Sequence, residues 1–415
     1  MKMKNKILYR FFGMLMILTS ILSCQQPDNN PFWNGGKEFF DSQQLYASER
    51  FPNVVLAMDG SVITTWGTSG FQVRRSEDGG ASWGPSIIVS DKKWWQSGYP
   101  GPGFQGGGTT VDENSGDILV FIEDGHPPSP LSVFRSRDQG LTWVKEDVVI
   151  HTDRFGNVPS MHMNETGITL KHGAHAGRLI RPSRVYLPRN SEVDDHPNPY
   201  TNAIYSDDGG KNWHSSDPFP AFGTGEAALE ELSDGTIYYN SRRMFSTDGL
   251  DPRWRHIAWS YDGGVTWENL SVSDVLPDGP QHHDYGLMGG LVRLPVEGHD
   301  ILLFSMVDVP AAYPGQEVSW TERTHKRERG TIWASFDGGK TWPVKRLVTE
   351  GSFAYSSLAA GRAGTPSEGL IYLLYEGRSV NMEGEHLGRF DSGHIVRFNL
   401  AWVTGGRNWK DFLPE

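Results

Sequence analysis

The stretch SYDGGVTW at residues 260–267 is one of five near-copies of a single eight-residue phrase, S-x-D-x-G-x-x-W. The other copies are SEDGGASW (76–83), SRDQGLTW (136–143), SDDGGKNW (206–213) and SFDGGKTW (335–342). Each copy follows a run typical of a β-strand, such as FQVRR or RHIAW. A D-G-G tip between such runs predicts a hairpin, in which the aspartate accepts bonds from turn N–H groups and glycine supplies a positive φ. The aspartates that we therefore expect to hold turns are Asp78, Asp138, Asp208, Asp262 and Asp337.

Successive copies begin 60, 70, 54 and 75 residues apart. These spacings are too long for one hairpin each and favour four-stranded blades with loops of varied length, as in an all-β propeller. The phrase closely resembles the Asp-box, or BNR repeat, of the sialidase (neuraminidase) superfamily. That resemblance implies a six-bladed β-propeller with one unboxed blade, and boxes on the rim away from the active site. We expect the ring to close by pairing of NVVLAMDGSVITTWG (53–67) with HIVRFNLAWVT (394–404).

The N-terminus reads as an export signal. Four basic residues precede the apolar stretch FFGMLMILTSIL (11–22), which is too short to span a bilayer. It ends at Ser23 and Cys24, the single cysteine of the chain, in a pattern that resembles a bacterial lipobox. The alternative is a simple secretory signal with an incidental cysteine. We predict a signal peptide over 1–23, lipidation at Cys24, a tether over 24–38 and the propeller over 39–415.

Composition limits the partners of the exported chain. Its formal net charge is −12, and becomes −16 once the four basic residues of the signal are removed. So acidic a surface argues against nucleic acid and against an anionic membrane surface as partners. We expect a monomer without internal disulfides, attached to a bacterial membrane only by its lipid, in the periplasm or on the cell surface. An anionic ligand must then meet a local basic cluster.

The resemblance to sialidases extends to residues outside the boxes. Arg50, in Arg-Phe-Pro, stands where the family has its first arginine. The stretch EAALEELSDGTIYYNSR (226–242) implies Glu226 as the catalytic glutamate and Arg242 as the second arginine. RERGTIWAS (327–335) has the family's spacing from the third arginine, here Arg327, to a box serine.

Two further motifs complete the implied site. FAYSSL (353–358) and IYLLYEG (371–377) match the family's A-Y-S-x-L and L-Y-E pair, which implies Tyr355 as nucleophile and Glu376 as the carboxylate that braces Arg50. Three converging guanidinium groups repel one another unless they bind an anion, and the planar fork of arginine suits a carboxylate. A sugar carboxylate, such as that of sialic acid, would repel a carboxylate nucleophile. A tyrosine starts neutral and can be deprotonated by Glu226.

The sequence departs from the family where the general acid belongs. Sialidases usually carry an aspartate between the first arginine and the first box, but TTWGTSGFQVRRSEDGG (64–80) holds no carboxylate before the box, and Asp59 belongs to the preceding turn. A natural leaving group needs protonation, which contributes about 10²–10⁴ in rate. The candidate replacement acids are Glu123, Asp124 and His126, and further candidates are His162, His282, His283 and Asp284.

We expect neither a cofactor nor a metal, because the adjacent His282 and His283 point to opposite faces of a strand and lack a complementary ligand pair. The resemblance implies a retaining exo-glycosidase of the exo-α-sialidase type, which releases terminal sialic acid from acidic glycans. Two alternatives stay open: a glycosidase for another acidic sugar, of 2-keto-3-deoxy or uronate type, and a non-catalytic glycan-binding propeller. The missing aspartate favours both alternatives, and the intact Tyr355, Glu226 and Glu376 argue against the second.

Overall fold

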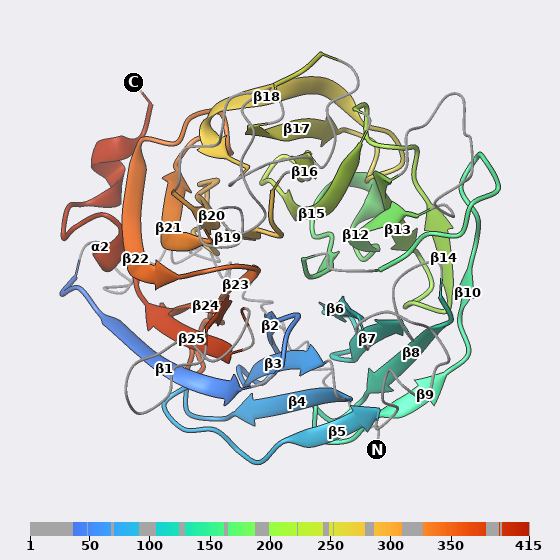
Figure 1. The fold of residues 1–415 in the computed structure, drawn as a ribbon, viewed down its shortest axis with the longest axis horizontal. Helices are drawn as coiled ribbons and strands as arrows, with labels where there is room; N and C mark the ends of the chain where they lie inside the picture. The colour runs from blue at the N-terminus through green and yellow to red at the C-terminus, as the bar shows by residue number, and fades with distance from the viewer. Residues whose placement is uncertain are drawn as a thin grey trace, which may run out of the picture.

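Six β-sheets stand around a central axis in the computed structural model, like the blades of a propeller (Figure 1). The residues that the structure describes are 36–47, 49–67, 70–90, 105–123, 129–161, 165–186, 199–221, 223–243, 249–251, 253–278, 286–308, 327–378, 390 and 392–414. The six-bladed, all-β prediction is confirmed.

Each blade carries four neighbouring antiparallel strands, and the third has an additional parallel edge strand, β10. The first blade comprises β2 (Asn53–Leu56), β3 (Val62–Gly67), β4 (Phe71–Ser76) and β5 (Ile87–Ser90). The second comprises β6 (Gln105–Val111), β7 (Ile118–Glu123), β8 (Leu131–Ser136) and β9 (Val144–Glu146). The third comprises β11 (Ile168–Thr169), β12 (Leu179–Val185), β13 (Tyr200–Ser206), β14 (Asn212–Ser215) and β10 (Val149–Ile150).

The remaining blades follow the same pattern. The fourth comprises β15 (Thr224–Glu231), β16 (Ile237–Arg243), β17 (Trp254–Ser260) and β18 (Glu268–Pro277). The fifth comprises β19 (Gly290–Arg293), β20 (Leu302–Val307), β21 (Glu328–Ser335) and β22 (Val344–Ser352). The sixth comprises β23 (Ser356–Ala360), β24 (Ile371–Gly377), β25 (Ser392–Phe398) and β1 (Phe40–Ala47). The described part of the chain also contains the short helices η2 (Gly173–His175), α2 (Leu400–Val403) and η3 (Trp409–Phe412).

The ring closes at a different N-terminal segment from the predicted one. Strand β1 pairs antiparallel with β25, from Phe40 opposite Phe398 to Ala47 opposite Ser392. The predicted partner, 53–67, instead forms β2 and β3 of the first blade. The prediction was wrong because β1, FDSQQLYA, is a polar edge strand without a strong hydrophobic signal. The C-terminal partner also ends early, since Asn399 caps helix α2 by accepting a bond from the Trp402 N–H.

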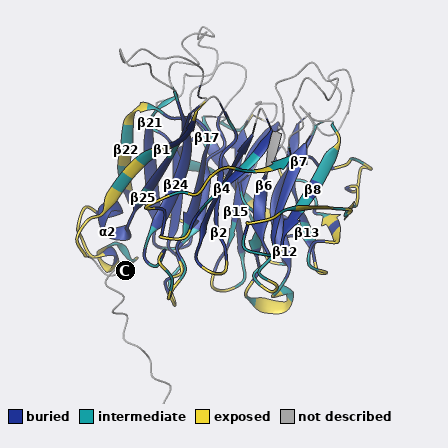
Figure 2. Cartoon of the chain, turned by 90° about the horizontal axis from the view of Figure 1, so that it is seen from below, coloured by how far each residue is buried: buried dark blue, intermediate teal, exposed yellow. Residues whose placement is uncertain are grey.

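The core lies within and between the blades, where most strands are buried (Figure 2). The largest cluster joins the fourth, fifth and sixth blades and includes Phe304, Trp333 and Val396. Helix α2 and Trp409 extend this cluster beyond the last strand. No helix within the described ranges is both long and apolar enough to cross a bilayer. The predicted signal peptide, Cys24 and residues 25–35 of the tether lie outside those ranges.

The five Asp-boxes follow the third strands of the first five blades, and their geometry is that of local turns. In the fifth blade, the Ser335 hydroxyl donates to Asp337 Oδ1 at 2.8 Å, and the Gly339 N–H donates to the Ser335 oxygen at 2.8 Å. Thr341 closes the turn by donating its N–H to Asp337 at 2.9 Å. Gly339 has a φ of 88°, and a Cβ there would lie 2.6 Å from the ring of Tyr238. The prediction that the box aspartates hold turns is confirmed.

Candidate functional site

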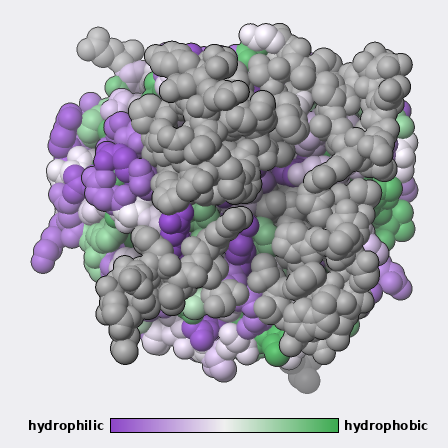
Figure 3. All heavy atoms as spheres, viewed as in Figure 1, coloured by the Kyte–Doolittle hydropathy of each residue, from purple (hydrophilic) through white to green (hydrophobic). Residues whose placement is uncertain are grey.

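The residues predicted to form the site lie together at the end of the propeller opposite the boxes. Because neighbouring strands in a blade are antiparallel, the starts of first and third strands share one edge with the ends of second strands. Arg50, Glu226 and Tyr355 lie at or just before the starts of the first strands β2, β15 and β23. Other elements place the remaining three: the second strands β16 and β24 end near Arg242 and Glu376, and Arg327 directly precedes the third strand β21. In the view of Figure 3, strongly hydrophilic residues are visible near the centre of the ring.

Tyr355 and Glu226 form a buried pair. The Tyr355 hydroxyl donates a hydrogen bond to Glu226 Oε1 at 2.9 Å, and the two side chains come from the sixth and fourth blades. The register of β15 against β16 shifts between Thr224 and Ala227, so Glu226 lies in a local bulge. Bulges re-aim side chains and recur beside active sites. This bulge brings a strand carboxylate against a tyrosine 129 residues away.

The protonation states of this pair follow from the charges around it. Burial would raise the pKa of Glu226, but the positive charges of Arg242 and Arg184 outweigh it and hold that pKa below its ordinary value. Arg242 Nη1 donates to Glu226 Oε2 at 2.5 Å. Burial and the Glu226 carboxylate together raise the pKa of Tyr355. The resting pair is therefore a neutral tyrosine hydrogen-bonded to an ionised glutamate, which can accept its proton.

Arg50 is braced by Glu376. Its Nη2 donates to Glu376 Oε2 at 2.8 Å, while the other carboxylate oxygen accepts the Phe51 N–H at 2.8 Å. Phe51 has a φ of 67° although it is not glycine and precedes a proline. Backbone in this region costs about 1–3 kcal/mol and persists where the surroundings enforce it. Glu376 stabilises this conformation because it binds both the Arg50 side chain and the backbone N–H of Phe51.

Arg50, Arg242 and Arg327 surround Tyr355. The guanidinium carbons of Arg50 and Arg327 lie 5.2 and 5.5 Å from the centre of the Tyr355 ring. Burial, together with the nearby charges of Arg50 and Arg242, lowers the pKa of Arg327. Within the described part of the chain, Arg327 forms no ion pair with a carboxylate. Three like charges thus converge, and the two carboxylates beside them pair with Arg50 and Arg242, which leaves Arg327 to be matched by an anion.

The candidate replacement acids have different outcomes. Glu123, at the end of β7, is described and buried, and its oxygens accept from the Ser160 hydroxyl at 3.0 Å and the Met161 N–H at 2.7 Å. Burial raises the pKa of Glu123 to about 7, so it is partly protonated at neutral pH. Its two oxygens are occupied by these local donors. The other named candidates, Asp124, His126, His162, His282, His283 and Asp284, lie outside the described residues.

The β3–β4 hairpin of the first blade contains no carboxylate before its Asp-box. Only three residues separate β3 from β4, and Gly67 pairs with Phe71 at the end of the hairpin. Asp59 lies at the box end, where it pairs with Arg75 at 2.6 Å. The described residues also contain no cluster of three or more metal-ligating side chains.

Arg184, in the third blade, escaped the sequence analysis. It is fully buried at the end of β12, with Nη1 3.4 Å from Glu226 Oε1. The signal was the sequence RPSR (181–184), which places two arginines within one strand of seven residues. The same run supplies Arg181, whose nearby carboxylates are Glu123 and Glu165.

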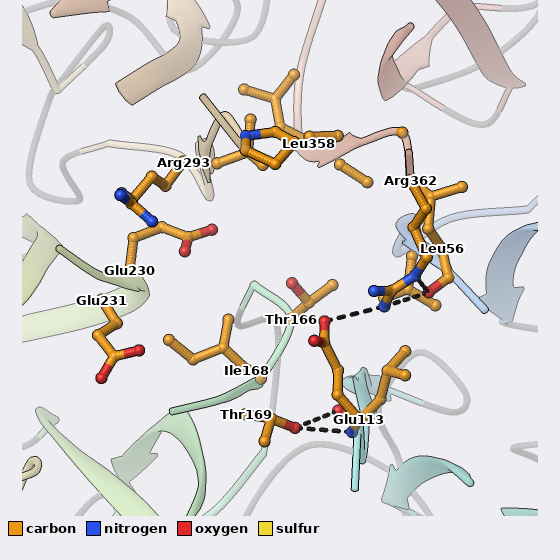
Figure 4. A pocket seen from close by; sticks show the side chains of 18 of the residues that line it. Leu56, Glu113, Thr166, Ile168, Thr169, Glu230, Glu231, Arg293, Leu358 and Arg362 are labelled. Carbon is orange, nitrogen blue, oxygen red and sulfur yellow. Dashed lines mark hydrogen bonds and ion pairs between the residues drawn. The ribbon is translucent and has the colours of Figure 1, made fainter. Parts of the chain in front are cut away.

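A cavity of about 450 Å³ lies at the opposite, box end of the axis (Figure 4). It is lined by the ends of first strands, and Glu113 bridges Arg362 and Lys171 there at 3.0 Å each. Arg293 pairs with Asp300 at 2.7 Å. These cations already have carboxylate partners, in contrast with Arg327.

A six-bladed propeller with Asp-boxes at one end and an arginine-lined tyrosine–glutamate pair at the other has the architecture of the sialidase superfamily. Residues 67–367 match the family model described as a BNR repeat-like domain, and the chain belongs to this family.

Comparisons with individual proteins agree. The sialidase of Micromonospora viridifaciens is 27% identical over 409 residues, which covers 89% of this chain and 55% of that protein. A Bacteroides fragilis sialidase is 27% identical over 305 residues, which covers 71% of this chain and 44% of that protein. The chain thus spans about half the length of these curated relatives.

The fold recurs in solved structures. A Hadza microbial sialidase superposes with a TM-score of 0.62 at 23% identity, covering 86% of this chain and 66% of that one. The intramolecular trans-sialidase of Ruminococcus gnavus, solved with oseltamivir carboxylate, superposes with a TM-score of 0.59 at 16% identity, covering 87% and 96%. At these sequence identities, the two similarities show that the propeller fold is shared.

Proposed function

We propose that the chain is a retaining exo-glycosidase that releases terminal sialic acid from glycans, with Tyr355 as nucleophile. The observation that carries this proposal is the hydrogen bond from Tyr355 to an ionised Glu226 inside a ring of three arginines. The names of the relatives support the same substrate class.

The arginines select an acidic sugar. Glu376 fixes Arg50, Glu226 fixes Arg242, and Arg327 is left to complete a cradle for one carboxylate. Charge-assisted bonds to arginine are short and strong, and their fork geometry orients a carboxylate as well as binding it. In sialic acid the carboxylate is attached to the anomeric carbon, so binding it in the cradle places that carbon near the Tyr355 hydroxyl.

The covalent step follows from this placement. The Tyr355 oxygen attacks the anomeric carbon while its proton passes to Glu226, and the bond from that carbon to the leaving oxygen breaks. The leaving oxygen takes a proton from an acid that the described residues do not identify. Water then displaces Tyr355 from the same face that the leaving group occupied and gives up a proton to the group that protonated the leaving oxygen, while Glu226 returns its proton to the tyrosine. Two displacements give net retention.

A second candidate substrate is another acidic sugar, favoured by the tight β3–β4 hairpin. Without the family's aspartate from that hairpin, protonation of an alcohol leaving group must come from elsewhere, or the natural substrate must have a better leaving group. The arginine cradle serves either sugar equally well.

The test is a release screen with sialosides and other acidic glycosides, each as a natural glycan and as an activated aryl glycoside. We expect release of sialic acid that disappears in the Tyr355→Phe variant. Release of a different acidic sugar would keep the mechanism and replace the substrate. Binding of acidic sugars without any release would make the chain a glycan-binding propeller and contradict the proposal.

A further inference from the structure

Arg184 has an environment that calls for a functional explanation. Its side chain is fully buried, and Nε, Nη1 and Nη2 all lack a hydrogen-bond acceptor among the described residues. One face of the guanidinium lies 4.1 Å from the centre of the Tyr186 ring. Buried charged groups are normally paired and hydrogen-bonded, because an unsatisfied one loses its hydration without replacement. Among the described carboxylates, Glu226 forms an ion pair with Arg184, whose Nη1 lies 3.4 Å from Glu226 Oε1.

We propose that Arg184 is a positioning residue for Glu226: its guanidinium keeps the glutamate ionised, with Oε1 directed at the Tyr355 hydroxyl. This inference rests on the proposed role of Glu226 as the base. Oε1 is the oxygen that Tyr355 and Arg184 share, whereas Arg242 binds Oε2. Burial lowers the pKa of Arg184 to about 10, so it remains a cation at neutral pH.

The two arginines beside Glu226 differ in access to a ligand. Arg242 belongs to the cradle, so a bound sugar carboxylate would share its positive charge and weaken its hold on Glu226. That loss raises the proton affinity of Glu226 at the moment when Tyr355 must give up its proton. Arg184 is fully enclosed and keeps its charge beside Oε1 throughout. Arg184 therefore continues to lower the pKa of Glu226 when a substrate occupies the cradle.

Few other charged or titratable side chains among the described residues face Glu226. Besides Arg184, the described charged or titratable side chains that face it are Arg242 from β16, Tyr355 ahead of β23 and, at longer range, Arg50 ahead of β2. Strands β19 and β13 also pack against β15, and each carries a charged or titratable side chain with a partner other than Glu226. Arg293 of β19 binds Asp300, and Tyr200 of β13 binds Asp153. Arg255 of β17 donates to the Glu226 backbone oxygen at 3.5 Å, and its ion-pair partner is Asp278.

The first experiment compares pH–rate profiles of Arg184→Gln, Arg184→Lys and wild type on an activated aryl sialoside. Glu226 must be ionised to act, so activity falls as the pH drops through its pKa. Without the Arg184 charge, that acidic limb should move to higher pH by about one unit or more. Arg184→Lys, which keeps the charge, should move it much less and provides a second variant if the glutamine variant folds poorly.

The matched control is Arg181→Gln. Arg181 lies on the same strand, is equally buried and also has nitrogens without acceptors, but its nearby carboxylates are Glu123 and Glu165. We expect it to lose stability without moving the acidic limb. Equal shifts in the Arg181 and Arg184 variants, or a lower rate with an unmoved limb in Arg184→Gln, would overturn the inference.

A second readout does not need turnover. In protein labelled with ¹³Cδ-glutamate, the Glu226 resonance, assigned by its loss in Glu226→Gln, should titrate at higher pH in Arg184→Gln than in wild type. If this shift occurs in a chain that cleaves no glycoside, the proposed function fails but the inference about Arg184 stands. An unchanged Glu226 titration overturns the inference, whether or not the chain is active.

Discussion

Asp337 at the box end and Glu226 at the opposite end both accept several hydrogen bonds, but from different kinds of donor. Asp337 is served by Ser335 and Thr341, neutral groups within four residues in the sequence. Glu226 accepts hydrogen bonds from Tyr355, 129 residues away, and from the buried Arg242, and it forms an ion pair with the buried Arg184. The Asp337 carboxylate thus receives these hydrogen bonds from residues of its own turn. Glu226 and its partners come from three blades, and one of these partners, Arg242, also belongs to the arginine cradle for the ligand.

The largest expected effect at the site comes from Glu226→Gln. Removing the base should lower kcat by about 10²–10⁴-fold, because Tyr355 then has no acceptor for its proton. The variant keeps the shape of the side chain, so circular dichroism should remain that of the wild type. The matched control is Asp337→Asn, which changes a carboxylate at the other end and should leave kcat essentially unchanged. Similar losses in both variants would erase the distinction between the two ends.

Arg327→Lys should weaken binding without a comparable loss of kcat. A charge-assisted hydrogen bond contributes about 1.5–3 kcal/mol, so an ammonium that cannot reproduce the fork should raise Kd for an acidic sugar by about 10- to 100-fold. Calorimetric titration measures this directly. Arg329→Lys is the neighbouring control, since Arg329 pairs with Glu350 outside the cradle at 2.5 Å. An unaltered Kd in Arg327→Lys would remove this residue from the cradle.

The sequence was informative where function and fold depend on local or spaced motifs. The boxes are complete within eight residues, so they predicted the blades, and the family spacing selected the six residues from Arg50 to Glu376 that the structure brings together. The closing strand β1 was missed because an edge strand buries little and carries a weak pattern. Arg184 was missed because its significance depends on contact with Glu226, 42 residues further along the chain and in another blade. Asp124 and His126 stay predictions.

The smallest expected effect concerns acid stability at the box end. Bonds from Ser82 and neighbouring groups lower the pKa of Asp78 to about 2, below the value of about 3.9 for an unfolded aspartate. A lowered folded-state pKa contributes stability that is present above about pH 4 and is lost as the pH falls toward 2. Asp78→Asn should therefore show a shallower decline of the unfolding midpoint across that range. An identical decline in both proteins would mean that this aspartate is not held as the structure shows.

The central claim is that Tyr355 forms a covalent bond with the anomeric carbon of an acidic sugar. Incubation with a 2,3-difluorinated sialic acid, followed by proteolysis and mass spectrometry, tests it most directly. The account predicts one added sugar on the peptide that contains Tyr355, and none in Tyr355→Phe. A sugar attached to any other residue, or a label that survives in Tyr355→Phe, would contradict it.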